Sequence, residues 1–211
     1  MKHAATRELF DYWDALRGAE IAPSRDALSP EPIRHLIGDM FLLSSERGEF
    51  YPIRVIGTRI CALAGRDIKG QDFLSLWDVQ SRHEMSDLLA IATEETIATV
   101  AGVTLRQGGH FRQGSHANQS SHVKHGSLAP RYLELLLLPF VADPAAARPS
   151  VAGALVPLTA PAAGELPFLH DLTLTSWRHL GYRRPTLRQR TIRKLAIAKG
   201  FMIYEGSGRD I

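Results

Sequence analysis

The chain has 211 residues, of which 45% are hydrophobic and 22% are charged, and its formal net charge is +3 at pH 7. This length suits one domain with extensions, and the hydrophobic content indicates a packed core and excludes a disordered chain. A net charge this small does not by itself indicate a nucleic-acid partner.

The cysteine count and the first residues bear on location. Cys61 is the single cysteine of the chain, which excludes an intramolecular disulfide and a zinc cage built from thiolates. Asp11, Asp14 and Glu20 interrupt the first twenty residues, so we expect no signal peptide there. Because no apolar run reaches the roughly 18 residues of a membrane span, we expect a cytoplasmic protein.

The first predicted element is an amphipathic helix within residues 1–20. Leu9, Phe10, Trp13 and Leu16 recur at helical spacing, with charged residues between them. Such an apolar stripe has to be buried on the chain's own sheet or on a partner. We expect these four residues to make a homodimer contact.

A short helix and a hairpin are expected next. Ser29 and Pro30 predict the start of a helix that runs to Ile37, because serine caps helices and proline suits their first turn. Apolar runs at 40–43 and 50–56 then predict two paired strands.

The second of these strands has a predicted orientation. Tyr51, Ile53 and Val55 alternate along it and are expected to share one face, with Arg54 on the other. Pro52 favours an edge position, because proline cannot donate to a neighbouring strand.

The middle of the chain alternates short helices, one long helix and strands. Short helices are expected from Ile60 to Ala64 and over 73–77, with Gly65 ending the first. The remaining elements are a long helix over 80–96 and three strands at 99–106, 132–140 and 151–158. This order predicts an α+β fold, with a five-stranded antiparallel sheet that carries its helices on one face.

Residues 161–211 are expected to form a linker and a basic helical extension. A second helix pair or an extension is predicted through Trp177, and a last helix is predicted from Thr186 to Gly200, with FMIY adding a short strand. No acidic residue occurs between positions 183 and 199, and the cations there are Arg183, Arg184, Arg188, Arg190, Arg193, Lys194 and Lys199.

The predicted organisation is thus an N-terminal helix at 1–20, a main domain at 21–160 and an extension at 161–211. Residues 107–129 interrupt the main domain with many glycines, serines and histidines, and are expected to be a mobile insertion. Its histidines are separated by five, five and two residues, which is not the close spacing of a zinc site, so we expect no metal there. They are His110, His116, His122 and His125.

A pattern over residues 54–70 carries a family resemblance. A strand arginine is followed by Gly-Thr, by Gly-Arg-acid and by a further glycine, which here are Arg54, Gly57, Thr58, Gly65, Arg66, Asp67 and Gly70. With SRDALSPEPIRHLIGDMFLL before it and YLELLLLPF after it, this segment resembles a stand-alone PAS family widespread in alphaproteobacteria. The resemblance covers roughly residues 8–160. It implies a PAS-like fold and a small regulatory protein, with no catalytic residue to carry over.

The resemblance also implies a cavity between the sheet and its helices, of the kind that suits a small ligand. Candidates to line it are Arg54, Thr58, Trp77, Tyr132 and Glu134, each of which could equally lie in the core or face solvent. Arg54 either binds an acidic ligand or pairs with a nearby acid such as Asp67 or Glu134.

Cofactors and catalysis find no support in the sequence. Cys61 lies in RICALAG, without the Asn-Cys-Arg-Phe-Leu-Gln context of flavin-binding PAS domains, and is interpreted as a small apolar residue on a helix. Haem would need His83 as its axial ligand, without a matching distal pattern. Motifs for acyl transfer, zinc hydrolysis and nucleotide binding are missing, so we expect no enzyme.

Two functions are therefore considered. The first is a non-catalytic PAS-type sensory protein in signal transduction, which acts through protein contacts as a homodimer and responds to a small molecule in its cavity. The alternative is a nucleotide or nucleic-acid binding protein that uses the basic segment 183–199. Arg184 and Arg188 have the spacing found in cyclic-dinucleotide receptors, but the companion Asp/Asn-x-Ser-x-x-Gly element is missing.

Overall fold

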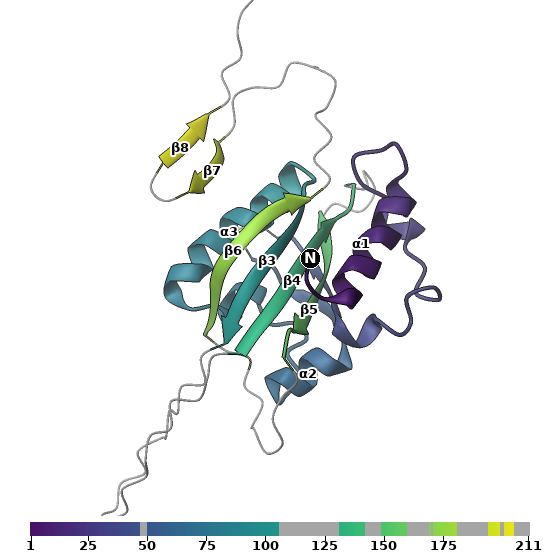
Figure 1. The fold of residues 1–211 in the computed structure, drawn as a ribbon, viewed down its shortest axis with the longest axis horizontal. Helices are drawn as coiled ribbons and strands as arrows, with labels where there is room; N and C mark the ends of the chain where they lie inside the picture. Colours follow the sequence, from purple (N-terminus) through teal and green to yellow (C-terminus); the bar gives the residue numbers. More distant parts are fainter. Residues whose placement is uncertain are drawn as a thin grey trace, which may run out of the picture.

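A six-stranded antiparallel sheet in the order β2–β1–β5–β4–β3–β6 forms the centre of the molecule (Figure 1). The computed structural model describes residues 1–46, 50–105, 131–141, 149–159, 169 and 171–180, and the backbone of two further strands at 194–198 and 201–204. Within these described ranges no helix is long and apolar enough to cross a membrane.

The elements have the following bounds. The strands of the sheet are β1 (Met40–Ser44), β2 (Ile53–Ile56), β3 (Ala98–Leu105), β4 (Arg131–Pro139), β5 (Ser150–Pro157) and β6 (Leu172–Leu180). The helices are α1 (Ala4–Arg17), α2 (Thr58–Ala64) and α3 (Val79–Glu94), with 3-10 turns η1 (Arg25–Ala27), η2 (Ile37–Asp39) and η3 (Phe73–Leu76). β7 (Lys194–Ala198) and β8 (Phe201–Tyr204) pair with each other as a separate hairpin.

Both faces of the sheet are covered by helices. Along β4, Leu133, Leu135 and Leu137 enter the main core with α2, η3 and α3, whereas Leu136 and Leu138 enter a second cluster under α1. Successive side chains of a strand point to opposite faces, so this split places α1 across the sheet from α3. In Figure 1, α3 lies behind β3 and β6, and α1 lies on the near side, beside β4 and β5.

Most elements predicted for the family-like region are confirmed. The strands β1 to β5, the helices α2 and α3 and the turn η3 occupy the expected segments, within a few residues at their ends. Gly65 ends α2 with φ 67°, a left-handed conformation that glycine adopts without strain. β2 lies at the edge of the sheet, as Pro52 predicts.

The prediction of five strands and a helical segment through Trp177 is wrong, because that segment is the sixth strand, β6. Leu172 and Leu174 alternate with Thr173 and Thr175, and β-branched residues suit a pleated strand. Leu172 is fully buried in the main core. Pairing with β3 therefore buries an apolar face that an isolated helix would leave in water.

Two other predicted helices are also wrong. The short helix expected from Ser29 is instead a series of turns ending in η2, where Arg34 and Leu36 donate their backbone N–H groups to the carbonyls of Glu31 and Ile33. The last helix is contradicted over Lys194–Ala198, which is β7, while residues 181–193 lie outside the described part. Ala198 pairs with Phe201.

The predicted face of Val55 is wrong as well. Leu42 pairs with Val55 but Leu43 pairs with Ile53, so Arg54 is an extra residue in the strand. Such a bulge shifts the alternation by one position. Tyr51 and Ile53 are buried, whereas Val55 is 51% exposed.

Candidate functional site

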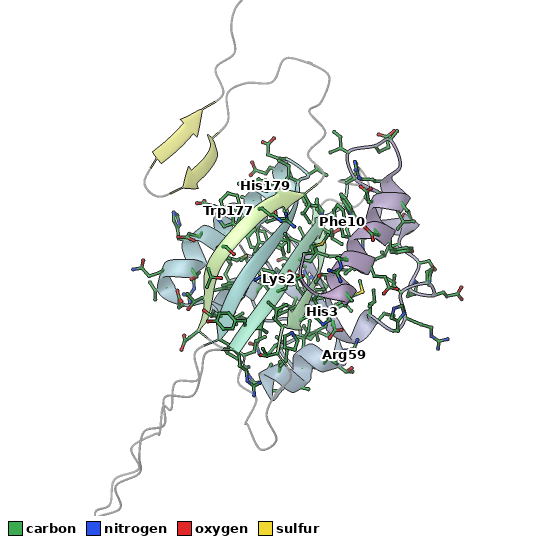
Figure 2. The ribbon with its side chains drawn as sticks, in the orientation of Figure 1. Lys2, His3, Phe10, Arg59, Trp177 and His179 are labelled. Atoms are coloured by element: carbon green, nitrogen blue, oxygen red, sulfur yellow. The ribbon has the colours of Figure 1, made fainter. Side chains whose placement is uncertain are left out.

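The N-terminus of α1 is held to the sheet by Glu134. Its carboxylate accepts hydrogen bonds from the backbone N–H of Lys2 at 2.6 Å, from the backbone N–H of His3 at 3.1 Å and from the hydroxyl of Thr6. We call these four residues the N-terminal anchor. Lys2 and His3 lie over β4 on the side of α1 (Figure 2).

Glu134 is only 5% exposed, so these donors, rather than water, stabilise its negative charge. Burial raises the pKa of Glu134, but the hydrogen bonds from Thr6, Lys2 and His3 outweigh it and hold the pKa below its usual value. The carboxylate is therefore ionised at neutral pH and stabilises the start of α1. Its donors Lys2 and Thr6 lie 132 and 128 positions before it in the sequence.

The apolar stripe of α1 is largely buried within its own chain. Leu9 and Trp13 are 1% and 3% exposed, and the Trp13 indole N–H donates to the carbonyl oxygen of Pro139 at 2.9 Å. Phe10 stacks on Trp13 and is half-buried, as is Leu16. Of the four residues predicted to make a dimer contact, only these last two reach the surface.

A bidentate ion pair joins the segment before β1 to the start of α2. Arg59 donates from Nε and Nη2 to the two carboxylate oxygens of Asp39, both at 2.7 Å, and from Nη2 to the carbonyl of His35 at 2.8 Å. Hydrogen bonding to the Asp39 carboxylate raises the pKa of Arg59. This pair fixes the entry to the sheet, and we assign it a structural role.

Trp77 lies in the main core between the sheet and the helices, with 1% of its surface exposed. Its backbone is fixed, because its N–H donates to Leu74 and its carbonyl accepts from Arg82 at 3.1 Å. Its ring packs edge-on against Phe73. Within the described residues its indole N–H has no hydrogen-bond partner. A buried donor without a partner costs about 1–3 kcal/mol and calls for an acceptor.

Asp78, the next residue, links α3 to β6. One carboxylate oxygen caps α3 by accepting from the Ser81 N–H at 2.7 Å, and the other accepts from the Thr173 hydroxyl at 2.6 Å. Burial raises the pKa of Asp78, but the hydrogen bonds from Ser81 and Thr173 outweigh it and lower the pKa. The carboxylate is thus ionised while it binds a helix and a strand.

Comparison with known proteins agrees with this architecture. The profile of the family described as PAS domain matches residues 1–156, which is most of the chain and includes α1 through nearly all of β5. The chain belongs to the PAS domain family. No curated protein matches it.

Membership indicates a sensory or regulatory role, since PAS domains generally sense signals rather than catalyse reactions and commonly mediate protein interactions. The matched region ends at residue 156, so β6, β7 and β8 lie after it. The PAS domain of this chain therefore carries an additional edge strand that the family match does not include.

The five residues predicted to line the PAS cavity do not gather in one place. Trp77 alone lies between the sheet and the helices of the main core. Glu134 lies on the opposite face, in the N-terminal anchor, and Tyr132, two residues earlier in the same strand, is 51% exposed. Arg54 and Thr58 are also exposed.

Several further predictions can be compared with the structure. The acid that pairs with Arg54 is Glu46, and neither Asp67 nor Glu134 does so; Arg54 also donates to the Ser44 hydroxyl at 2.8 Å. Cys61 is half-buried on α2. The His83 side chain is 79% exposed on α3. The insertion 107–129, with its four histidines, and most of the basic segment lie outside the described residues.

Gly57 is required because the backbone passes too close for a side chain. Its backbone angles are ordinary, but a Cβ atom there would lie 2.2 Å from the carbonyl oxygen of Gly38. The strand end and η2 therefore touch backbone to backbone.

Some residues of the site gave only weak signals in the sequence. Asp78 stands before the long helix as an N-cap would, but its second partner, Thr173, is 95 positions away. Thr99 and His179 form a hydrogen bond at 2.9 Å across β3 and β6, and burial lowers the pKa of His179. His179 and Trp177 lie side by side on β6 (Figure 2). A pairing of this kind was hidden because β6 itself was predicted as a helix.

Proposed function

We propose that this PAS protein is a non-catalytic sensor whose main core binds a small molecule through the indole N–H of Trp77. The observation that carries the proposal is that buried donor, which has no partner among the described residues. The Trp77 ring packs against Phe73, which in turn stacks on Phe41, and all three belong to the apolar main core. The ligand class that fits is a largely apolar molecule with one hydrogen-bond acceptor.

Native mass spectrometry of freshly purified protein tests the proposal. We expect the wild-type chain to retain a small molecule and the Trp77→Phe variant to lose it, because phenylalanine keeps an aromatic ring but removes the donor. Trp177→Phe is the matched control and should retain the same mass. The proposal is overturned if wild-type protein carries no added mass, or if Trp77→Phe carries the same one.

The output of the sensor is proposed to be a protein contact made by a cytoplasmic homodimer. Support comes from the PAS domain family, whose members commonly dimerise. Since Leu9 and Trp13 are buried in their own chain, a contact through α1 has to use Leu16 and Phe10.

Light scattering tests the dimer. The wild-type protein should have twice the chain mass of 23.3 kDa, and Leu16→Glu should bring it to the monomer mass. Ala15→Glu places the same charge on the exposed neighbouring position and serves as the control. A monomeric wild type contradicts the proposal, as does a Leu16→Glu variant that remains a dimer.

A second candidate, binding of nucleic acid or a nucleotide, is favoured by the seven cations and no acids over positions 183–199. A truncation to test it should follow Leu180, because an earlier cut would remove β6 and damage the sheet. Salt-sensitive binding of a labelled single-stranded DNA that disappears on this truncation would support the candidate. Equal binding by the truncated chain would exclude it.

A further inference from the structure

We infer that β6 is the element that transmits a change at Trp77 to the segment that follows the PAS domain, an inference that rests on the proposed function. β6 follows the family-matched residues 1–156 in the chain. It pairs with β3 along its full length, with one register shift between Gly102 and Val103. The chain continues from its end into the basic segment 183–199.

The start of β6 is fastened to the residue next to Trp77. Trp77 itself forms a parallel β-bridge with Leu172, and the Asp78 N–H donates to the Leu172 carbonyl at 3.0 Å. The Thr173 hydroxyl donates to Asp78, and the Leu174 N–H donates to the Ser81 hydroxyl at 2.9 Å. We call this set the β6 junction.

The β6 junction makes the position of Trp77 and the pairing of β6 interdependent. Asp78 divides its carboxylate between the cap of α3 and Thr173, so a shift of the backbone at Trp77 changes both contacts. Further along, the side-chain hydrogen bonds of β6 go to β3: the Thr175 hydroxyl donates to the Gly102 carbonyl, and Thr99 and His179 share a hydrogen bond. A displacement at residues 77–78 therefore acts on the start of β6, which is hydrogen-bonded to α3.

Hydrogen exchange on the full chain tests the coupling, with wild-type protein, Trp77→Phe, Thr173→Val and the double variant. Thr173→Val keeps the β-branched shape and removes only the hydroxyl. We expect exchange of peptides from 172–180 to be roughly fivefold faster in Thr173→Val, the factor for one lost hydrogen bond. Trp77→Phe should accelerate the same peptides, and this effect should vanish in the Thr173→Val background.

The controls separate coupling from general loosening. Thr175→Val removes a hydroxyl that bonds within the sheet, to the Gly102 carbonyl, and should leave the Trp77→Phe effect intact. Peptides from β4 and β5 should exchange at the wild-type rate in every variant. Unchanged exchange of 172–180 in Trp77→Phe, or purely additive effects in the double variant, would overturn the inference. Because this readout needs no ligand, its failure is distinct from failure to retain a small molecule.

Discussion

Glu134 and Lys2 are 132 positions apart in the chain, yet the Lys2 backbone N–H donates to the Glu134 carboxylate at 2.6 Å. This contact joins the first residues of the chain to the middle of the sheet. It shows that the outer face of the PAS sheet is closed by a specific polar anchor as well as by apolar packing of Leu9 and Trp13.

Glu134→Gln should therefore lower the free energy of unfolding by about 1.5–3 kcal/mol, the range for hydrogen bonds to a charged group. Glutamine removes the charge and replaces one acceptor oxygen by an NH2 group, which faces either the Lys2 N–H or the His3 N–H instead of accepting from it. Urea denaturation at pH 7 measures the change. Glu84→Gln, on the exposed surface of α3, is the control and should change stability by less than about 0.5 kcal/mol. Equal losses in the two variants would contradict the anchor.

Acid should destabilise the protein through Glu134 and Asp78, whose pKa values are both lowered in the folded state. A lowered folded pKa contributes stability that is fully present above the ordinary carboxyl pKa, about 4. That stability is lost as the pH falls from about 4 through the lowered values. Urea midpoints between pH 7 and pH 2.5 should show this loss, and Glu134→Gln should show less of it. An identical acid loss in the variant would contradict the role of Glu134.

The two buried indoles should respond differently to loss of their N–H groups. Trp13→Phe leaves the Pro139 carbonyl without its donor, whereas Trp77→Phe removes a donor that has no partner among the described residues. In protein stripped of ligand by unfolding and refolding, Trp13→Phe should cost about 1 kcal/mol more than Trp77→Phe. Differential scanning calorimetry measures both. A larger cost for Trp77→Phe would mean that Trp77 has a partner even in the stripped protein.

Two glycines of the PAS-like motif should differ in their tolerance of alanine. Gly57→Ala places a methyl group against the Gly38 carbonyl and should cost about 3 kcal/mol or more, because backbone cannot move aside as a side chain can. Gly70 has φ 82° with open space around it, so Gly70→Ala should cost only the strain of a left-handed alanine, about 1–2 kcal/mol. Denaturation of the two variants checks the order. The reverse order would contradict the backbone contact.

The PAS core could be predicted from sequence because its signals are local. Leu135 to Leu138 form one apolar run, α3 has its repeat of Met85, Leu88, Leu89 and Ala92, and Gly65 ends a helix where it should. The α+β class follows from the order of these elements.

What could not be predicted depends on partners distant in sequence. Thr173 and His179 gain their roles only when β6 pairs with β3, and a helical interpretation of 172–180 hides both. Arg54 meets Glu46 because a bulge shifts its strand by one position, which no alternation pattern reveals. Glu134 is a candidate for the cavity lining by sequence, but strand register puts it on the other face, under α1.

The most direct test of a ligand at Trp77 is the indole N–H resonance of that residue in a ¹H–¹⁵N spectrum, assigned with Trp77→Phe. Spectra are compared for freshly purified protein and for protein stripped by unfolding and refolding. We predict that the Trp77 signal moves while that of Trp13, which is bonded to Pro139 in both, stays in place. A Trp77 signal at the same position in both samples would contradict the proposal that a small molecule accepts its hydrogen bond.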